Sequence, residues 1–363
     1  MRVSRSDATE GMGYDAWFPT TRSSAFACAF AGMLLNGSWP ILTKVSGVKR
    51  WQVFFFFFNC GFVVAALGIG FALGGGLPPI KREWCSVYAL AAGPVAAAGL
   101  CLGLASMEVL GLAVVAPTST GVEIVVGTTL LYAIRPDAAD PLALFGGVAL
   151  AAAAVYCAAR AAEALEADRS DAGAKPSDGV GLLFDGDVAT PKRPRYSRVE
   201  RRRGFAVGAA TGLAMASWPV LYGSARACGV AIFEFIPAFA LPFFLASVYA
   251  YLPLAALWPL QGKRVEPAEL FEAGLLGGCA AAAAGVAWAS AVSLVFLATP
   301  KLTITVSFAI ARCYPLVTAA AGIAFFGEAD GASHRTRAWL AGEFLCYGCG
   351  VGLICASKRV DWT

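Results

Sequence analysis

Long apolar runs recur along nearly the whole chain, and this feature restricts the possible folds more than any other. Each run has about 18 residues or more, which is enough to cross roughly 30 Å of hydrocarbon as a helix. Hydrophobic residues make up 58% of the 363 residues and charged residues only 14%, so a soluble fold could not bury its apolar side chains. The sequence therefore predicts an all-α polytopic protein of the plasma membrane or an endomembrane, with the lipid bilayer as its solvent.

Ten transmembrane helices are predicted, in two groups of five separated by a charged stretch. They are placed at 24–43, 52–73, 84–105, 111–133, 140–159, 204–224, 231–258, 270–298, 302–326 and 338–357. The stretch at 160–203 is rich in charged residues, Gly and Pro, which is typical of a flexible linker. The predicted organisation is a polar tail at 1–23, a first five-helix repeat at 24–159, this linker, a second five-helix repeat at 204–357 and a tail at 358–363.

The two groups of helices share sequence. Aligning 26–42 with 205–221 without a gap gives eight identities in seventeen positions, and these include a Ser-Trp-Pro triplet at the same place in each segment. Because each group holds an odd number of spans, the second group must enter the membrane from the opposite side. The sequence therefore predicts inverted repeats, an architecture that recurs in carriers that work by alternating access.

The two Ser-Trp-Pro triplets predict part of a binding site. Pro40 cannot donate to the carbonyl of Asn36, and Pro219 cannot donate to that of Met215, so each kink leaves an acceptor free beside a tryptophan. This combination suits a sugar ring or a planar heterocycle. Interfacial packing of the tryptophans is the alternative. The substrate-binding candidates in these two spans are Asn36, Ser38, Trp39, Ser217, Trp218 and Tyr222.

Two ionisable side chains lie deep inside predicted spans. Glu123 is near the middle of the fourth span and Arg312 is near the middle of the ninth, which are corresponding helices of the two repeats. Charges at this depth usually face a cavity or a partner. We expect an ion pair, or a shared polar cavity that meets the solute or a coupling proton; a fixed pair without a transport role is the alternative. Further candidates are Trp288 and Tyr314, with Ser290, Ser293 and Glu234 behind them.

The chain lacks the signatures of an enzyme or a nucleic-acid-binding protein. A net charge of +4 is small for a nucleic-acid partner, and no G-x-x-x-x-G-K-[ST] phosphate loop occurs. Cys346 and Cys349 have metal-ligand spacing, but they fall inside a predicted span, and the one histidine, His334, lies in a predicted loop. We therefore predict no catalytic residue, no cofactor and no metal.

Short motifs resemble a known family. Ten spans in two repeats, Gly-Ser-Trp-Pro at Gly37–Pro40, and Phe-Gly-Glu at 326–328 resemble the drug/metabolite transporter superfamily, and the first-span motif is most similar to its ureide permease and transmembrane-protein-144 branch. The resemblance implies a carrier of sugars or nitrogenous heterocycles, with a pocket between the repeats that admits Trp39, Glu123, Trp218, Trp288 and Arg312. Ureide permeases have a longer central region with a nucleotide-binding-like motif; its absence here disfavours purine-type substrates.

The predicted function is a secondary carrier that moves a small polar organic solute, sugar-like or nucleobase-like, by alternating access, with protons as a candidate coupling ion through Glu123. The first alternative is a non-transporting membrane scaffold or regulatory subunit that retains the fold, and a sealed, dry interface between the repeats would favour it. The second is an intramembrane enzyme, for which the chain offers no clustered carboxylates and no Ser-His pair.

Overall fold

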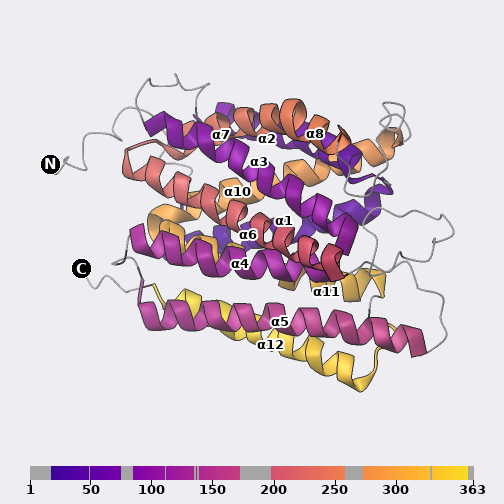
Figure 1. The fold of residues 1–363 in the computed structure, drawn as a ribbon. Coiled ribbons are helices and arrows are strands. Elements are labelled where there is room, and N and C mark those ends of the chain that lie inside the picture. The colour runs from indigo at the N-terminus through magenta and orange to yellow at the C-terminus, as the bar shows by residue number, and fades with distance from the viewer. Residues whose placement is uncertain are drawn as a thin grey trace.

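The computed structural model describes residues 18–48, 50–74, 85–110, 112–134, 136, 139–171, 198–257, 273–327 and 329–358, and these residues form helices without any strand (Figure 1). The helices are α1 (Arg22–Ser46), α2 (Trp51–Gly74), α3 (Cys85–Leu110), α4 (Leu112–Ile134), α5 (Pro141–Asp171), α6 (Arg198–Ala227), α7 (Ile232–Ala246), a π-helical turn (Ser247–Tyr251), α8 (Leu252–Leu257), α10 (Gly274–Ala311), α11 (Pro315–Phe326) and α12 (His334–Ala356).

Nine helical segments among the described residues are long and apolar enough to cross a membrane, and α4 adds a shorter apolar segment at Thr118–Ile134. The protein is therefore an all-α, multi-pass integral membrane protein, as the sequence predicts. The predicted seventh span, 231–258, is built from α7, the π-helical turn and α8.

Two contacts between backbones bring α2 and α10 close together. A Cβ added at Gly61 would lie 1.9 Å from the Ala282 carbonyl oxygen, and one added at Gly285 would lie 1.9 Å from the carbonyl oxygen of Phe58. Helices that approach this closely gain packing contact in lipid, where no hydrophobic effect drives them together. The result is a compact crossing, with a cluster of aromatic side chains from α1, α2, α6, α7 and α10 beside it.

Helices α5 and α12 form an antiparallel pair along one edge of the bundle (Figure 1). Asp140 N–H donates to the Ser357 carbonyl at 2.6 Å at one end of the pair. At the other end, the Asp168 carboxylate accepts from Ser333 N–H at 2.9 Å and from the Thr336 hydroxyl at 2.6 Å. We call this second end the linker end, because α5 ends there and α6 begins beyond it, and we call the opposite end the far end.

The helices continue into both sides of the stretch expected to be a flexible linker. The sequence predicts that the fifth span ends at residue 159, whereas α5 runs on to Asp171, and α6 begins at Arg198 rather than at 204. Asp168 lies in this extension, where its bonds to the start of α12 give the polar helix a tertiary contact. Residues 172–197 lie outside the described residues.

The chain reverses direction at a single residue between the predicted eighth and ninth spans. The start of α10 lies beside the end of α1, because a Cβ added at Gly277 would be 2.8 Å from the Ser46 carbonyl oxygen. The end of α11 lies there too, because the Lys44 ammonium is 4.9 Å from the centroid of the Phe326 ring. Both places are at the linker end, so the segment between them must travel to the far end and return. The reversal is at Thr303, with φ 73° and ψ 156°. Residues 299–301, which the sequence places between the spans at 270–298 and 302–326, are helical.

Candidate functional site

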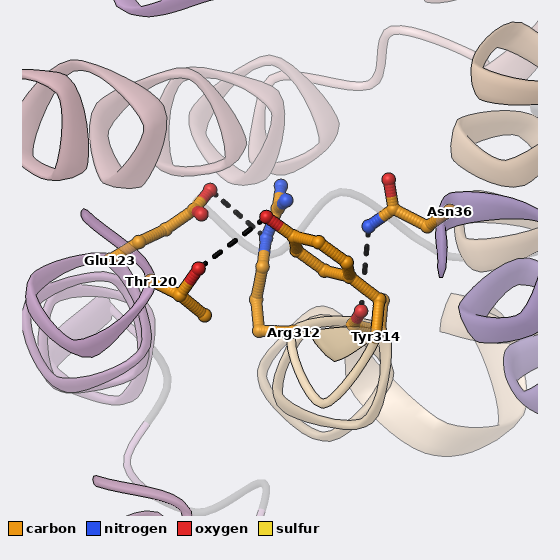
Figure 2. A network of polar contacts seen from close by, with 6 residues as sticks. Asn36, Thr120, Glu123, Arg312 and Tyr314 are labelled. Atoms are coloured by element: carbon orange, nitrogen blue, oxygen red, sulfur yellow. Dashed lines mark hydrogen bonds and ion pairs between the residues drawn. The ribbon is translucent and has the colours of Figure 1, made fainter. Parts of the chain in front are cut away.

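The ninth span is broken in its middle. Helix α10 ends at Ala311, residues 312–314 form turns, and α11 restarts with Pro315 at its first position. Pro315 has no N–H to donate to the Ala311 carbonyl four residues back, so the helical ladder is interrupted there. The Asn36 side chain of α1 donates to that carbonyl at 3.5 Å (Figure 2). A polar side chain of the neighbouring helix therefore forms a hydrogen bond at the break.

Arg312 lies at this break and reaches α4. Its Nε is 3.0 Å from Glu123 Oε1, and the side chains are 6% and 4% exposed (Figure 2). These two atoms are not aligned for a hydrogen bond, so attraction between the charges accounts for the contact. The guanidinium carbon also lies 4.8 Å from the Phe308 ring centroid and 6.0 Å from that of Trp218. A buried charge is tolerated when paired in this way, and the predicted ion pair is present.

Two further hydrogen bonds connect the broken span to its neighbours. The hydroxyls of Tyr314 and Thr120 of α4 are 3.4 Å apart (Figure 2), and the Thr318 hydroxyl of α11 donates to the Gly37 carbonyl of α1 at 2.9 Å. A Cβ at Gly37 would lie 2.5 Å from Cβ of Val317, so α1 and α11 also pack closely here. The break is thus positioned from both sides, by α1 and by α4.

A small inner cavity lies against the break. It has a volume of about 20 Å³ and is lined by Asn36, Trp218, Trp288 and Arg312 together with apolar residues of α10. This space holds about one water molecule. Trp218 Nε1 is buried without a hydrogen-bond partner among the described residues. Four of the predicted substrate-binding residues therefore meet around one cavity, which is too small for an organic solute in this conformation.

A larger outer cavity opens at the far end. It has a volume of about 560 Å³. Its lining consists of Leu131, Ile134, Tyr222, Gly223, Arg226, Thr299, Pro300, Thr303, Ile304, Thr305 and Lys358. The Tyr222 hydroxyl is 3.3 Å from that of Thr299. This volume is in the range of cavities that hold small organic ligands.

A thin layer of side chains separates the two cavities. Ile304 lines both of them. The Tyr222 ring stacks on that of Phe296 with centroids 3.7 Å apart and planes at 8°, and Tyr222 lines the outer cavity whereas Phe296 lines the inner one. A solute that entered from the far end would have to displace this layer to reach Arg312.

Several predicted residues do not line either cavity. The Ser38 hydroxyl donates to Leu35 O at 2.7 Å and the Ser217 hydroxyl to Leu213 O at 2.7 Å, so both bond to their own helices. Trp39 packs edge-on against Phe58, with ring centroids 5.7 Å apart. Among the secondary candidates, the Ser293 hydroxyl bonds to Ala289 O, and the Glu234 carboxylate accepts from Ala231 N–H at the start of α7.

The outer cavity brings together residues that sequence reasoning did not select as site residues. Arg226, Thr303 and Thr305 all line it. Three threonines in 299–305, next to an otherwise apolar span, are the signal that could have suggested it. Thr120 was also missed, because its role depends on Tyr314 being brought beside it by the broken helix. Within the described residues, no three His, Cys, Asp or Glu side chains gather closely enough to hold a metal ion.

Comparison with known proteins establishes the fold only. No protein-family model and no curated protein matches the chain. A solved structure described as "Crystal structure of protein" is 14% identical, with a TM-score of 0.55, over 94% of this chain and 100% of the other. The shared architecture therefore extends over nearly the whole length of both chains.

Proposed function

We propose that the protein is a secondary carrier that moves a small polar organic solute across a membrane by alternating access between two inverted five-helix repeats. Ten spans are counted by adding α4 to the nine segments of full length, since α4 has 23 helical residues. The resemblance of the first-span motif to the drug/metabolite transporter superfamily supports the same proposal.

The pattern of helix contacts supports inverted repeats. If each helix is exchanged for the equivalent helix of the other repeat, the contact between α1 and α10 becomes the contact between α6 and α3. In the same way, the contact between α2 and α10 becomes the contact between α7 and α3. The pairs α2 with α7 and α5 with α12 map onto themselves. Both members of these two exchanged pairs are present, as expected for a pseudo-two-fold axis in the membrane plane.

The observation that carries the proposal is the buried Glu123–Arg312 pair at the break in the ninth span. Discontinuous helices and buried charges at mid-membrane are costly, and transporters use them where solute and coupling ions bind. The pair spans the two repeats, because Glu123 belongs to the first and Arg312 to the second. Any rocking of one repeat against the other would change it, and Glu123 is the candidate carrier of a coupling proton.

The large outer cavity and the small inner cavity fit one end state of such a cycle. In the exchanged state an equivalent cavity would open at the linker end. The position equivalent to Tyr222 is Thr43, one residue beyond the aligned segments, and Thr43 is fully buried in this conformation. The proposal therefore predicts that Thr43 becomes accessible when the far end closes.

Uptake into proteoliposomes tests the function. Wild-type protein would be assayed with labelled sugars, nucleobases and amino acids, with and without a pH gradient. Glu123→Gln is expected to abolish stimulation by the gradient, whereas Glu163→Gln, an equal change at an exposed position of α5, is expected to behave as wild type. Absence of uptake for the whole panel and for organic anions would reject the carrier.

A non-transporting scaffold is the second candidate, and the inner cavity of about 20 Å³ within an aromatic cluster favours it. A charge swap separates the two. In the double variant Glu123→Arg with Arg312→Glu, a scaffold would recover its fold and lose nothing else. A carrier is expected to recover folding yet retain a defect in uptake or in its pH dependence.

A further inference from the structure

Among the described residues, the outer cavity is lined by basic but not acidic side chains. Arg226 lies in the last turn of α6 and Lys358 follows the end of α12, and the remaining lining residues are hydroxyl-bearing or apolar, apart from one glycine and one proline. The Arg226 cation, whose printed hydrogen bond goes to a neutral carbonyl, gives this concave, partly apolar site a positive potential that concentrates anions. Rings of Arg and Lys are how pores for anions and phosphates obtain selectivity.

Arg226 retains donors that the fold does not use. One guanidinium nitrogen, Nη1, donates to the Val230 carbonyl at 2.8 Å. A basic residue in the last turn of a helix also complements the helix dipole. A single N–H and the charge account for both of these structural roles, and among the described residues the other guanidinium N–H groups have no partner. A planar fork of this kind matches a carboxylate or a phosphate.

Buried hydroxyls in the same lining also lack partners. The Oγ1 atoms of Thr303 and Thr305 are buried without a hydrogen-bond partner among the described residues, and Thr305 is fully buried. An unpaired buried hydroxyl is unfavourable, and an acceptor atom of a ligand would relieve it. Thr303 also holds φ 73°, a strained conformation for a β-branched residue. Guanidinium and hydroxyl donors around one space form a donor set for an oxyanion.

We infer that the outer cavity binds a small organic anion bearing a carboxylate or phosphate group, and that this is the substrate class of the carrier. The inference rests on the proposed function and changes the expected solute from a neutral sugar or nucleobase to an anion. The volume of about 560 Å³ admits such a molecule. Beyond Ile304, which lines both cavities, the next cation on the inward path is Arg312.

Binding to the full chain in nanodiscs, measured by isothermal titration calorimetry, tests the inference without requiring transport. The probes are inorganic phosphate, malate, glucose and uracil, at low and high salt. We expect phosphate or malate to bind, more weakly at high salt. Arg226→Gln is expected to weaken that binding by about tenfold or more, and Thr305→Val by roughly threefold to tenfold. Arg337→Gln, an exposed arginine at the linker end, is the matched control and is expected to leave it unchanged.

The outcomes separate this inference from the carrier proposal. Whether phosphate or malate binds decides between the two anion chemistries, and either result supports the inference if it depends on Arg226. Arg226→Lys keeps the charge but loses the planar fork, so it is expected to bind the anion more weakly than wild type and more tightly than Arg226→Gln, and it preserves the test if the glutamine variant does not fold. Three results would overturn the inference. Glucose or uracil binds and neither anion does; an anion binds equally well to Arg226→Gln; or no probe binds. Anion binding without uptake would instead reject the carrier.

Discussion

The fourth and ninth spans occupy corresponding places in the proposed repeats, yet one is continuous and the other is broken. Helix α4 runs from Leu112 to Ile134 without interruption and carries Glu123 on a regular helical surface. The ninth span ends one helix at Ala311 and begins another at Pro315, and it presents Arg312 from the turn between them. The ion pair thus joins one continuous helix to one interrupted helix.

The neighbouring helices reflect this difference. Helix α1, beside the broken span, carries Asn36, whose amide reaches the Ala311 carbonyl. In α6, beside the continuous span, the aligned residue is Met215, a flexible apolar side chain. A polar residue is present where the ladder is interrupted and an apolar residue where it is not. Asymmetry between the halves is therefore concentrated at the site of the buried charge.

The largest effect is expected from separating the pair that joins the two spans. Glu123→Ala or Arg312→Ala leaves the other charge buried without a partner, which should lower the free energy of unfolding by about 3–5 kcal/mol. Chemical unfolding in detergent micelles measures this. If both variants lowered the free energy of unfolding by the same small amount, the pair would be hydrated. The comparison between a continuous and an interrupted helix would then not rest on a buried ion pair.

A smaller effect should distinguish the two helices that flank the spans. Asn36→Leu removes the side-chain donor to the Ala311 carbonyl, which keeps a hydrogen bond from Tyr314 N–H at 3.3 Å, and it should destabilise the protein by about 0.5–1.5 kcal/mol. Met215→Leu, at the aligned position of α6, should cost less than about 1.5 kcal/mol. Thermal unfolding of the two variants side by side gives the comparison. If Met215→Leu destabilised the protein more than Asn36→Leu, the polar contact beside the interrupted span would not be the stabilising one.

Hydroxyl deletion in the two spans sharpens the same point. Thr318→Val in α11 removes a bond to Gly37 of α1 and should cost about 0.5–1.5 kcal/mol. In α4 the Thr129 hydroxyl bonds to Val125 of its own helix on an exposed face, so Thr129→Val should change stability by less than about 0.5 kcal/mol. Equal losses of stability in the two variants would show that the hydrogen bond from Thr318 to α1 does not stabilise the interrupted span.

The smallest effect is expected at the helices that follow the two spans, where the partly buried carboxylate of Asp168 accepts hydrogen bonds from the start of α12. Hydrogen bonds from Thr336 and Ser333 hold the pKa of Asp168 below its ordinary value. A lowered folded-state pKa stabilises the protein above the ordinary pKa of about 4, and this stabilisation is lost as the pH falls through the lower value. Asp168→Asn should therefore lower the unfolding temperature slightly at pH 7, and the difference from wild type should shrink toward pH 3. A pH-independent difference would argue against an ionic contribution.

Much of this fold follows from composition and periodicity. Apolar runs of membrane-crossing length predict helices, since a lipid-exposed chain must satisfy its backbone internally. Glu123 and Arg312 were recognisable because charges deep in apolar spans need a partner. The sequence therefore predicts that these two side chains form a pair, but not the distance between them.

The break and the outer cavity could not be placed from the sequence. Pro315 signals an interrupted ladder, but the same signal at Pro40 and Pro219 occurs inside continuous helices, so proline alone does not identify a break. The reversal at Thr303 depends on a left-handed backbone that threonine rarely adopts. The outer cavity gathers residues from α4, α6, α10 and the end of α12, which only tertiary packing brings together.

The central claim is that the two repeats exchange roles, and accessibility of single cysteines tests it most directly. In a background without native cysteines, Gly223→Cys reports the outer cavity, where an added Cβ would lie 3.5 Å from its nearest neighbour, and Thr43→Cys reports its buried counterpart at the linker end. Gly223→Cys should react with a membrane-impermeant thiol reagent only from the far end, Thr43→Cys only from the linker end, and a bulky label at one should slow labelling at the other. Reaction of both from one side, or independent labelling, would contradict alternating access.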